Sequence, residues 1–498
     1  MSGDPRSHVE LRPGAYADSV TLLQVSRRVQ GVDGVATAQV AMATPLNLDV
    51  LAQMGFTLPD STPNDMVVAI RLDHPGALEA ALAAVDQALT RTVTRSAGDT
   101  GLEPHRTTGS ALRDLLGDAP TDTLVLVSVP GASATVEAMD ALDSGRDVMV
   151  FSDNVPVEEE VALKQIATDR GLLVMGPDCG TAVVDGLGLG FANATQPGPV
   201  GIVAASGTGC QQLLALLDHA GVGVSSALGV GGRDLSSAVG GLSTREALRR
   251  LDADPSVELI VVVSKPPSAD VAAQVREYAE GLDTPVLYAL LGPGQPDLTA
   301  AAEAVLGAVG NDVPEWPVTV VESKPAGALL RGLFVGGTLC DEAMLVTAQL
   351  LGPVHSNIPL EPELAVGADL GAAFGLDAHL MLDFGDDALT QGRAHPMIDP
   401  ALRLEHLATV AADPRTGVIL LDVVLGHGAE PDPAASLAPA IADAVGRGIP
   451  VIVSCVGTTS DPQGLDRQVS ALADAGAEVH LSNANAARRA AALIGGHS

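Results

Sequence analysis

Strand-like apolar runs that end in small residues and lead into amphipathic helices recur along most of this chain. Clear examples are DTLVLVSVPG from residue 122, GPVGIVAASGTG from 198 and GVILLDVVLG from 417. A nearly continuous apolar run followed by a helix is typical of a parallel sheet covered on both faces. The pattern therefore predicts an α/β protein with several doubly wound parallel-sheet domains, Rossmann-like and flavodoxin-like.

Length and composition support this fold class. A chain of 498 residues exceeds the size of one core, so we expect three or four domains. Apolar residues make up 47% but aromatic residues only 2%, so the core has to be built from Ala, Val, Leu and Ile. The formal charge of -34 repels phosphate backbones and anionic lipids, so we expect no nucleic-acid and no membrane partner.

The cysteines are widely spaced and form no C-x-x-C pair, which argues against a disulfide framework and a zinc site; they are Cys179, Cys210, Cys340 and Cys455. The start of the chain shows no signal-peptide pattern, and no run reaches the ~18 apolar residues of a membrane span. The sequence predicts a cytoplasmic protein without a metal site.

Composition changes along the chain suggest four parts. Residues 1–110 alternate short strand and helix patterns, as in a small α/β sandwich of ferredoxin-like type. An irregular Gly/Thr-rich linker over 93–120 contains the first boundary. The regular strand-helix pattern then divides at proline-rich and glycine-rich turns into 111–197, 198–314 and 315–498. The first of these is the expected Rossmann-like domain, and the other two are the expected flavodoxin-like domains.

Two helices are expected to begin at glycine-rich turns after buried strands. The first turn holds Ser206, Gly207, Thr208 and Gly209, and the second holds Gly336, Gly337 and Thr338. Free N–H groups of a helix start bind anions, and each start favours a charge by roughly 0.3–1 kcal/mol. We predict that both turns bind one phosphate group; the alternative is a pair of ordinary capped turns.

The segment GDDALTQGRAHPMIDP concentrates charged groups after an apolar strand. A guanidinium binds phosphate or carboxylate in a two-pronged way, and histidine moves protons near neutral pH. We therefore predict catalytic roles for Arg393, His395 and Asp399, with Asp386 and Asp387 beside them. The alternative is a charged surface loop.

Two further strand ends carry cations. Lys265 in VSKPP is a predicted catalytic residue that stabilises developing negative charge, and Arg233 in GVGGRD is a predicted substrate-binding residue. Each is alternatively a solvated side chain. Cys179 in GPDCG is interpreted as a small packing residue rather than a nucleophile.

Several of these segments resemble the succinyl-CoA synthetase family. GLLVMGPDCG is similar to its G-x-x-x-x-G-P-N-C segment, GPVGIVAASGTG to its S-G-T helix start, and GGTLC with MLDFGDDA to the carboxyl-terminal domain of its partner subunit. The resemblance implies that 111–197 is CoA-binding-like and that 198–314 and 315–498 are ligase-like domains. In that family, two such helices face each other across a phosphohistidine.

Over nearly the whole chain, the resemblance is to FdrA-type proteins, on strings such as FSDNVPVEEE, VSKPP and GRAHPMIDP. That family implies either an acyl-CoA synthetase or one component of a multisubunit oxamate carbamoyltransferase of allantoin and purine catabolism. The latter converts oxalurate and phosphate into oxamate and carbamoyl phosphate. Partner subunits and an oligomer are therefore expected.

The chain departs from the synthetase pattern at two places. Where that family carries its active histidine, this chain has GPGQPDLTAAAEAVLG and no histidine, which argues against a phosphohistidine relay. Residues 93–120 lack the glycine-rich turn that approaches CoA, so CoA is only a possible ligand. We expect phosphate or carbamoyl phosphate as substrate and no firmly bound cofactor. The alternatives are a CoA ligase subunit and a noncatalytic scaffold for a phosphorylated metabolite.

Overall fold

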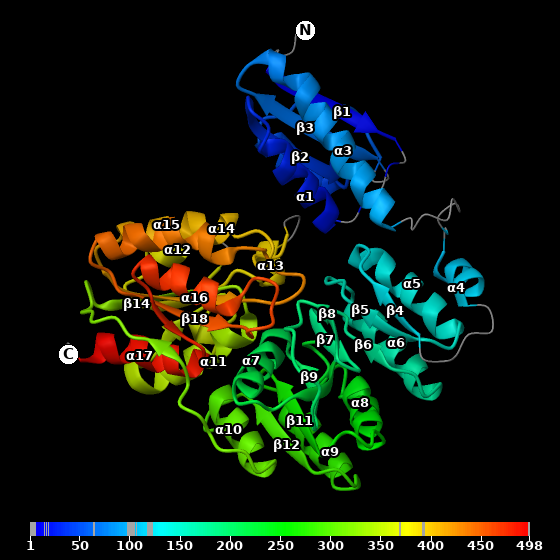
Figure 1. The fold of residues 1–498 in the computed structure, drawn as a ribbon, viewed down its shortest axis with the longest axis vertical. Coiled ribbons are helices and arrows are strands. Elements are labelled where there is room, and N and C mark those ends of the chain that lie inside the picture. The colour runs from blue at the N-terminus through cyan, green and yellow to red at the C-terminus, as the bar shows by residue number, and fades with distance from the viewer. Residues whose placement is uncertain are drawn as a thin grey trace. The chain divides into compact units, whose positions relative to one another are not determined.

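The computed structural model describes residues 6–13, 15, 17, 19–62, 65–96, 105, 107–116, 123–367, 370–390 and 394–496. The chain forms two compact units, one of residues 1–111 with 390–394 and one of residues 112–389 with 395–498 (Figure 1). The α/β fold class predicted from the sequence is confirmed, with parallel sheets in the second unit and a small α/β domain in the first. Among the described residues, no helix has the length and apolar character needed to cross a bilayer.

The first unit is built on an antiparallel sheet of order β1-β3-β2. Its strands are β1 (Ser7–Arg12), β2 (Val35–Met42) and β3 (Met66–Leu72), and its helices are α1 (Ser19–Gln30), α2 (Pro45–Gln53), the 3-10 turn η1 (Pro75–Ala77) and α3 (Leu78–Ser96). Alternate residues of β3 face opposite sides, so Val68 and Ile70 pack under α1 and α3 while Val67 and Ala69 pack under α2.

The prediction of an irregular linker over 93–120 is wrong in part. In its described residues, α3 continues to Ser96 and a further helix, α4 (Thr108–Leu116), follows. The nine residues of α4 give too short an apolar pattern to stand out in the sequence, and isolated helices of that length are marginal in water.

The second unit begins with a parallel sheet of order β4-β5-β6. It comprises β4 (Leu124–Val127), α5 (Gly131–Asp143), β5 (Asp147–Val150), α6 (Val157–Asp169) and β6 (Val174–Met175). Lys164 of α6 is fully buried and joins this sheet to the next, because its ammonium contacts Glu160 at 2.8 Å and Asp234 at 2.7 Å.

The next sheet has six strands in the order β12-β11-β9-β10-β7-β8. Its elements are β7 (Thr181–Val184), β8 (Leu187–Gly190), β9 (Val200–Ala205), α7 (Gly207–His219), β10 (Val224–Gly229), α8 (Leu242–Asp252), β11 (Leu259–Ser264), α9 (Ala269–Ala279), β12 (Val286–Leu290) and α10 (Leu298–Ala308). The hairpin of β7 and β8 pairs antiparallel with β10, so this sheet draws strands from residues before 198.

The last sheet has seven strands in the order β13-β19-β18-β17-β14-β16-β15. Its strands are β13 (Val318–Thr319), β14 (Leu329–Phe334), β15 (Val354–His355), β16 (His379–Asp383), β17 (Thr416–Val424), β18 (Val451–Val456) and β19 (Glu478–His480). Its helices are α11 (Gly337–Leu351), the 3-10 turn η2 (Pro362–Leu364), α12 (Leu370–Phe374), α13 (Asp387–Thr390), α14 (Ala401–Ala412), α15 (Pro433–Gly446), α16 (Leu465–Asp474) and α17 (Asn483–Gly495).

The six-stranded and seven-stranded sheets share one core. Its buried apolar residues come from both sheets and from α7, α10, α11 and α17, which lie in contact with one another. Every residue of α7 from Gly209 to Leu217 is buried, as expected for a helix packed on all sides. The two sheets are therefore held in a fixed relation.

The glycine-rich turns follow the strands at which the strand order reverses. In the six-stranded sheet β9 has β10 on one side and β11 on the other, and in the seven-stranded sheet β14 lies between β16 and β17. In open α/β sheets, ligands bind in the crevice at such a switch point, at the carboxyl ends of the strands. Here α7 follows β9 and α11 follows β14, so both helix starts occupy that position.

Candidate functional site

The starts of α7 and α11 are in direct contact. The hydroxyl groups of Ser206 and Thr338 lie 2.7 Å apart and share a hydrogen bond. Thr208 packs against Gly336 so closely that a Cβ at Gly336 would lie 2.8 Å from the Thr208 methyl group. The structure thus brings together all seven residues of the two turns named in the sequence analysis.

Several backbone donors of these turns remain open. Among the described residues, the N–H groups of Gly207, Thr208, Gly337 and Thr338 have no protein acceptor, whereas the N–H of Gly209 donates to Ser206 Oγ at 3.0 Å. Gly207 is exposed, and Thr208 and Gly337 are partly exposed. We call these four N–H groups the cradle; they lie at the positive ends of two helices, where an anion is favoured, and of the four residues only Thr338 is buried.

The N–H groups just before α11 already have an acceptor. Those of Val335 and Gly336 donate to the carboxylate of Asp422 at 2.8 and 2.9 Å, and Arg403 contacts the same carboxylate at 3.0 Å. Burial raises the pKa of Asp422 to about 6, although Arg403 opposes the rise. Asp422 therefore fixes the backbone just before α11. The N–H groups in the first turn of α11 itself stay open to a ligand.

Lys265 lies beside the cradle, directly after β11. Its Nζ lies 3.1 Å from where a Cβ at Gly337 would be placed. Burial acts to lower the pKa of Lys265, but the carboxylates of Asp341 and Asp383 outweigh it, and the pKa is raised. Lys265 therefore carries a positive charge next to the open N–H groups.

Asp383 and Asp341 are site residues that the sequence analysis missed. Burial raises the pKa of Asp383 to about 7 and that of Asp341 to about 6, while Lys265 opposes both shifts. Asp383 Oδ2 lies 2.7 Å from where a Cβ at Gly337 would be placed. Asp383 could have been found from the sequence, because it stands at the end of a buried strand, where ligands bind in such sheets. Asp341 lies inside a helix pattern, and nothing in the sequence marks it as a site residue.

His395 lies near Asp383. Its Nε2 lies 2.7 Å from where a Cβ at Gly385 would be placed, and Asp383 Oδ1 lies 3.1 Å from the same point. The ring packs against Phe191, and its Nδ1 accepts the N–H of Met397 at 3.2 Å. Burial lowers the pKa of His395 to about 4, so the ring is neutral at pH 7 and carries its proton on Nε2.

The other predicted site residues lie in different settings. Arg233 donates to Val155 O at 2.8 Å and pairs with buried Glu160 at 2.9 Å, which commits part of its guanidinium to holding the β4-β5-β6 sheet. Asp399 accepts the N–H of Ala401 at 3.1 Å at the start of α14. Arg393 lies outside the described residues.

Cys179 is buried, and burial raises the pKa of its thiol to about 12. The thiol is therefore protonated at neutral pH, which favours a packing role over a nucleophilic one. Within the described ranges, no three His, Cys, Asp or Glu residues are grouped so that they could hold a metal ion.

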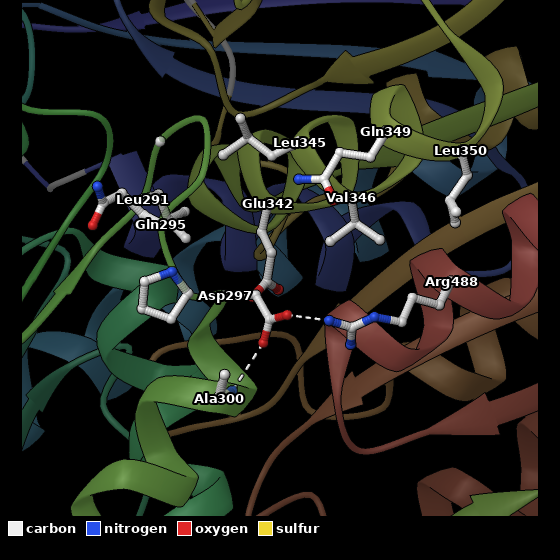
Figure 2. A pocket seen from close by; sticks show the side chains of 12 residues that line it. Leu291, Gln295, Asp297, Ala300, Glu342, Leu345, Val346, Gln349, Leu350 and Arg488 are labelled. Atoms are coloured by element: carbon white, nitrogen blue, oxygen red, sulfur yellow. Dashed lines mark hydrogen bonds and ion pairs between the residues drawn. The ribbon is translucent and has the colours of Figure 1, made fainter.

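The loop after β12 is the segment in which the succinyl-CoA synthetase family carries its active histidine and this chain has none. It lines a cavity of about 280 Å³ (Figure 2). Leu345 and Val346 of α11 line it, and Arg488 pairs with Asp297 at its edge. Glu342 is buried at its base and accepts hydrogen bonds from Leu298 N at 2.6 Å and Asn483 Nδ2 at 2.7 Å. Glu342 of α11 thus binds the start of α10, directly after this loop, and the start of α17.

Known protein families match two parts of this chain. Residues 333–493 match the CoA-ligase family, and residues 1–107 match a family described as AllF, heavy metal-associated domain. The alpha 2 subunit of an ADP-forming succinate–CoA ligase of Archaeoglobus fulgidus is 30% identical over 44% of this chain and 75% of its own length. An acetyl-coenzyme A synthetase of Ca. Korarchaeum cryptofilum, solved with phosphate and ADP, is 18% identical with a TM-score of 0.30, over 80% of this chain and 86% of that one.

The chain is an α/β protein that matches the CoA-ligase family over residues 333–493 and is related to the alpha subunits of succinate–CoA ligases. Another relative matches this chain over nearly its whole length. The YahF protein of Escherichia coli K12 is 38% identical over 96% of both chains, and the present chain belongs to its family.

Proposed function

We propose that this chain is an FdrA-type component of a multisubunit carbamoyltransferase that interconverts oxalurate plus phosphate and oxamate plus carbamoyl phosphate. The observation that carries this proposal is the anion cradle, formed by the N–H groups of Gly207, Thr208, Gly337 and Thr338 beside Lys265. Such donors stabilise a phosphate group and the negative charge that develops on a carbonyl oxygen.

The missing histidine also supports this reaction. Transfer of a carbamoyl group between phosphate and an amide needs no phosphorylated protein intermediate, and the 291–297 loop offers no histidine to form one. The match of residues 1–107 to the AllF domain family supports a role in allantoin breakdown. In this proposal, the partner subunits supply the catalytic and binding groups that the reaction needs and this chain does not carry.

The test is phosphate-dependent cleavage of oxalurate by the chain purified with its partner subunits. Wild-type complex should form carbamoyl phosphate and oxamate in equal amounts. Lys265→Met should lower turnover by about 10²–10³-fold, the usual effect of removing one donor to a developing charge. Lys324→Met is the matched control, because Lys324 is exposed and lies in the connection between β13 and β14.

The proposal fails if the wild-type complex gives no phosphate-dependent cleavage. It also fails if Lys265→Met and Lys324→Met complexes turn over equally, because Lys265 would then not act on the reacting groups. Melting temperatures of the two variants show whether each is folded.

A second candidate is an acyl-CoA ligase subunit, which the match of residues 333–493 to the CoA-ligase family favours. In that case another group must carry the phosphoryl group in place of histidine. Titration of the intact chain with CoA, and incubation of the complex with labelled ATP, distinguish the two. Tight CoA binding together with acid-stable label on the protein would favour the ligase.

A further inference from the structure

Asp383 reaches the cradle from the seven-stranded sheet, whereas Lys265 comes from the six-stranded sheet. It is the last residue of β16 and pairs with Phe334 of β14, so its side chain leaves the sheet where α11 begins. Oδ2 would lie 2.7 Å from a Cβ at Gly337, so only glycine leaves room for it there. One carboxylate oxygen is therefore at the first residue of the helix whose open N–H groups form the cradle.

The rest of Asp383 is held rigidly. The side chain of Asn357 binds both backbone polar groups of Asp383. It accepts the Asp383 N–H at 2.9 Å and donates to the Asp383 carbonyl oxygen at 2.8 Å. Oδ1 accepts the N–H of Gly385 at 2.8 Å. One oxygen is thus fixed by the backbone while the other faces the ligand position, an arrangement suited to proton transfer in a set direction.

The charges around Asp383 come from several elements. Lys265 after β11, Asp422 on β17 and Asp386 after β16 act on Asp383 itself, and the neutral His395 lies near Oδ1. Lys265 in turn faces Asp341 on α11 and Asp178 after β6. Burial is the main cause that raises the pKa of Asp383 to about 7, with Lys265 opposing it. Near pH 7 the group is present both with and without its proton.

Two neighbouring groups, His395 and Lys265, are poor proton carriers; the pKa of Asp341 is also raised, to about 6, but it is Asp383 Oδ2 that lies nearest to the Cβ position of Gly337. His395 has a pKa lowered to about 4 by burial and stays neutral, while Lys265, whose pKa is raised, keeps its proton. Asp399 accepts an N–H at the start of α14.

We infer that Asp383 is the proton carrier of the site, moving one proton from hydrogen phosphate to the departing amide nitrogen of an N-carbamoyl amide. This inference rests on the proposed function, in which the amide is oxalurate. A phosphate oxygen bonds to the carbamoyl carbon, and the bond from that carbon to the amide nitrogen breaks. Asp383 accepts the proton that hydrogen phosphate loses and gives it to the amide nitrogen. Oxamate then leaves with a neutral amide group.

The experiment compares Asp383→Asn, Asp383→Glu and Asp377→Asn in the assembled complex. Asn keeps the shape of the side chain and can accept the Gly385 N–H, but it cannot carry a proton. Asp377 is the control, because it is exposed and precedes the other end of the same strand. Two quantities are measured, phosphorolysis between about pH 5 and 9 and binding of inorganic phosphate by calorimetry.

Asp383→Asn should lower turnover by about 100-fold or more, leave phosphate affinity within about 3-fold, and remove the limb of the pH profile near neutrality. Asp383→Glu should recover part of the turnover and the limb, and Asp377→Asn should match wild type. Unchanged turnover or an unchanged pH profile in a folded Asp383→Asn complex overturns the inference while the proposed function stands. An inactive wild-type complex overturns both.

Discussion

Buried carboxyl groups gather around the start of α11. Asp341, Glu342, Asp383 and Asp422 are all buried, and burial raises the pKa of each. Cations near them include Lys265, Arg403 and Arg488. An ionised carboxylate without a cation costs several kcal/mol in the interior, so such groups hold their protons to a higher pH than in water.

Glu342 gives a pH dependence of stability that can be measured. Burial, and then the nearby Asp297, raise its pKa from 4.5 to about 7. Between these values the native state holds more protons than the unfolded state, so the free energy of unfolding falls as pH rises. The contribution of Glu342 to this fall is on the order of 3 kcal/mol between pH 4.5 and 7.

Glu342→Gln should therefore have a melting temperature that declines less steeply than that of wild type over this pH range. Melting curves at several pH values measure the two slopes. Glu363→Gln is the control, because Glu363 is exposed on η2, and its slope should match wild type. Equal slopes for wild type and Glu342→Gln would contradict the prediction.

At the scale of single elements, the main feature is the meeting of two helix starts that lie far apart in the sequence. Ser206 caps α7 and also bonds Thr338 in the first turn of α11, 132 residues later. Each helix start brings a partial positive charge, and two such charges close together repel one another unless an anion lies between them. Their contact therefore favours a bound anion.

Gly337→Ala tests this arrangement. The new Cβ would lie 2.7 Å from Asp383 Oδ2 and 3.1 Å from Lys265 Nζ, so both groups must move away from the cradle. We expect the affinity of the intact chain for inorganic phosphate, measured by calorimetry, to fall by about tenfold, or ~1.4 kcal/mol.

Gly307→Ala is the matched control for that substitution. Gly307 is also helical, and a Cβ there has nothing within 4 Å. It should leave phosphate affinity unchanged and stabilise the chain by roughly 0.5–1 kcal/mol. If Gly337→Ala binds phosphate as tightly as Gly307→Ala, the first turn of α11 does not form the anion site.

At the scale of the whole second unit, the site depends on one core shared by two sheets. Hydrogen bonds between buried polar groups connect elements of this core. Asn483 of α17 donates to Leu339 O at 2.9 Å and to Glu342 at 2.7 Å, accepts from Ser454 of β18 at 2.9 Å, and gives its backbone N–H to Gln212 of α7 at 2.9 Å. Its partners thus belong to both halves of the site.

Asn483→Ala should destabilise both sheets together. It leaves buried polar atoms of Leu339, Glu342 and Ser454 without their partner, at a cost of about 2–4 kcal/mol in all. Calorimetry should show a single transition for the two sheets at a lower temperature. Asn485→Ala, on the same helix but only partly buried, should change the transition little. A transition that splits, with one part unmoved, would contradict a shared core.

The sequence determined most of the local structure. The strand-helix alternation predicted the α/β fold class, and the glycine-rich turns after β9 and β14 marked where α7 and α11 begin. Such features depend on residues within a few turns of one another, so periodicity and capping reveal them. The helix α4 was missed because nine residues give too short a pattern.

Tertiary structure alone decided which side chains share the site. Asp341 and Asp383 come beside Lys265 only because two sheets pack on one layer of helices, and no local pattern distinguishes them from other acidic residues. Burial likewise sets the charge of His395, which the sequence analysis expected to titrate near neutral pH. A residue type indicates which chemistry is possible, whereas desolvation and long-range neighbours, which depend on the completed fold, determine its protonation state.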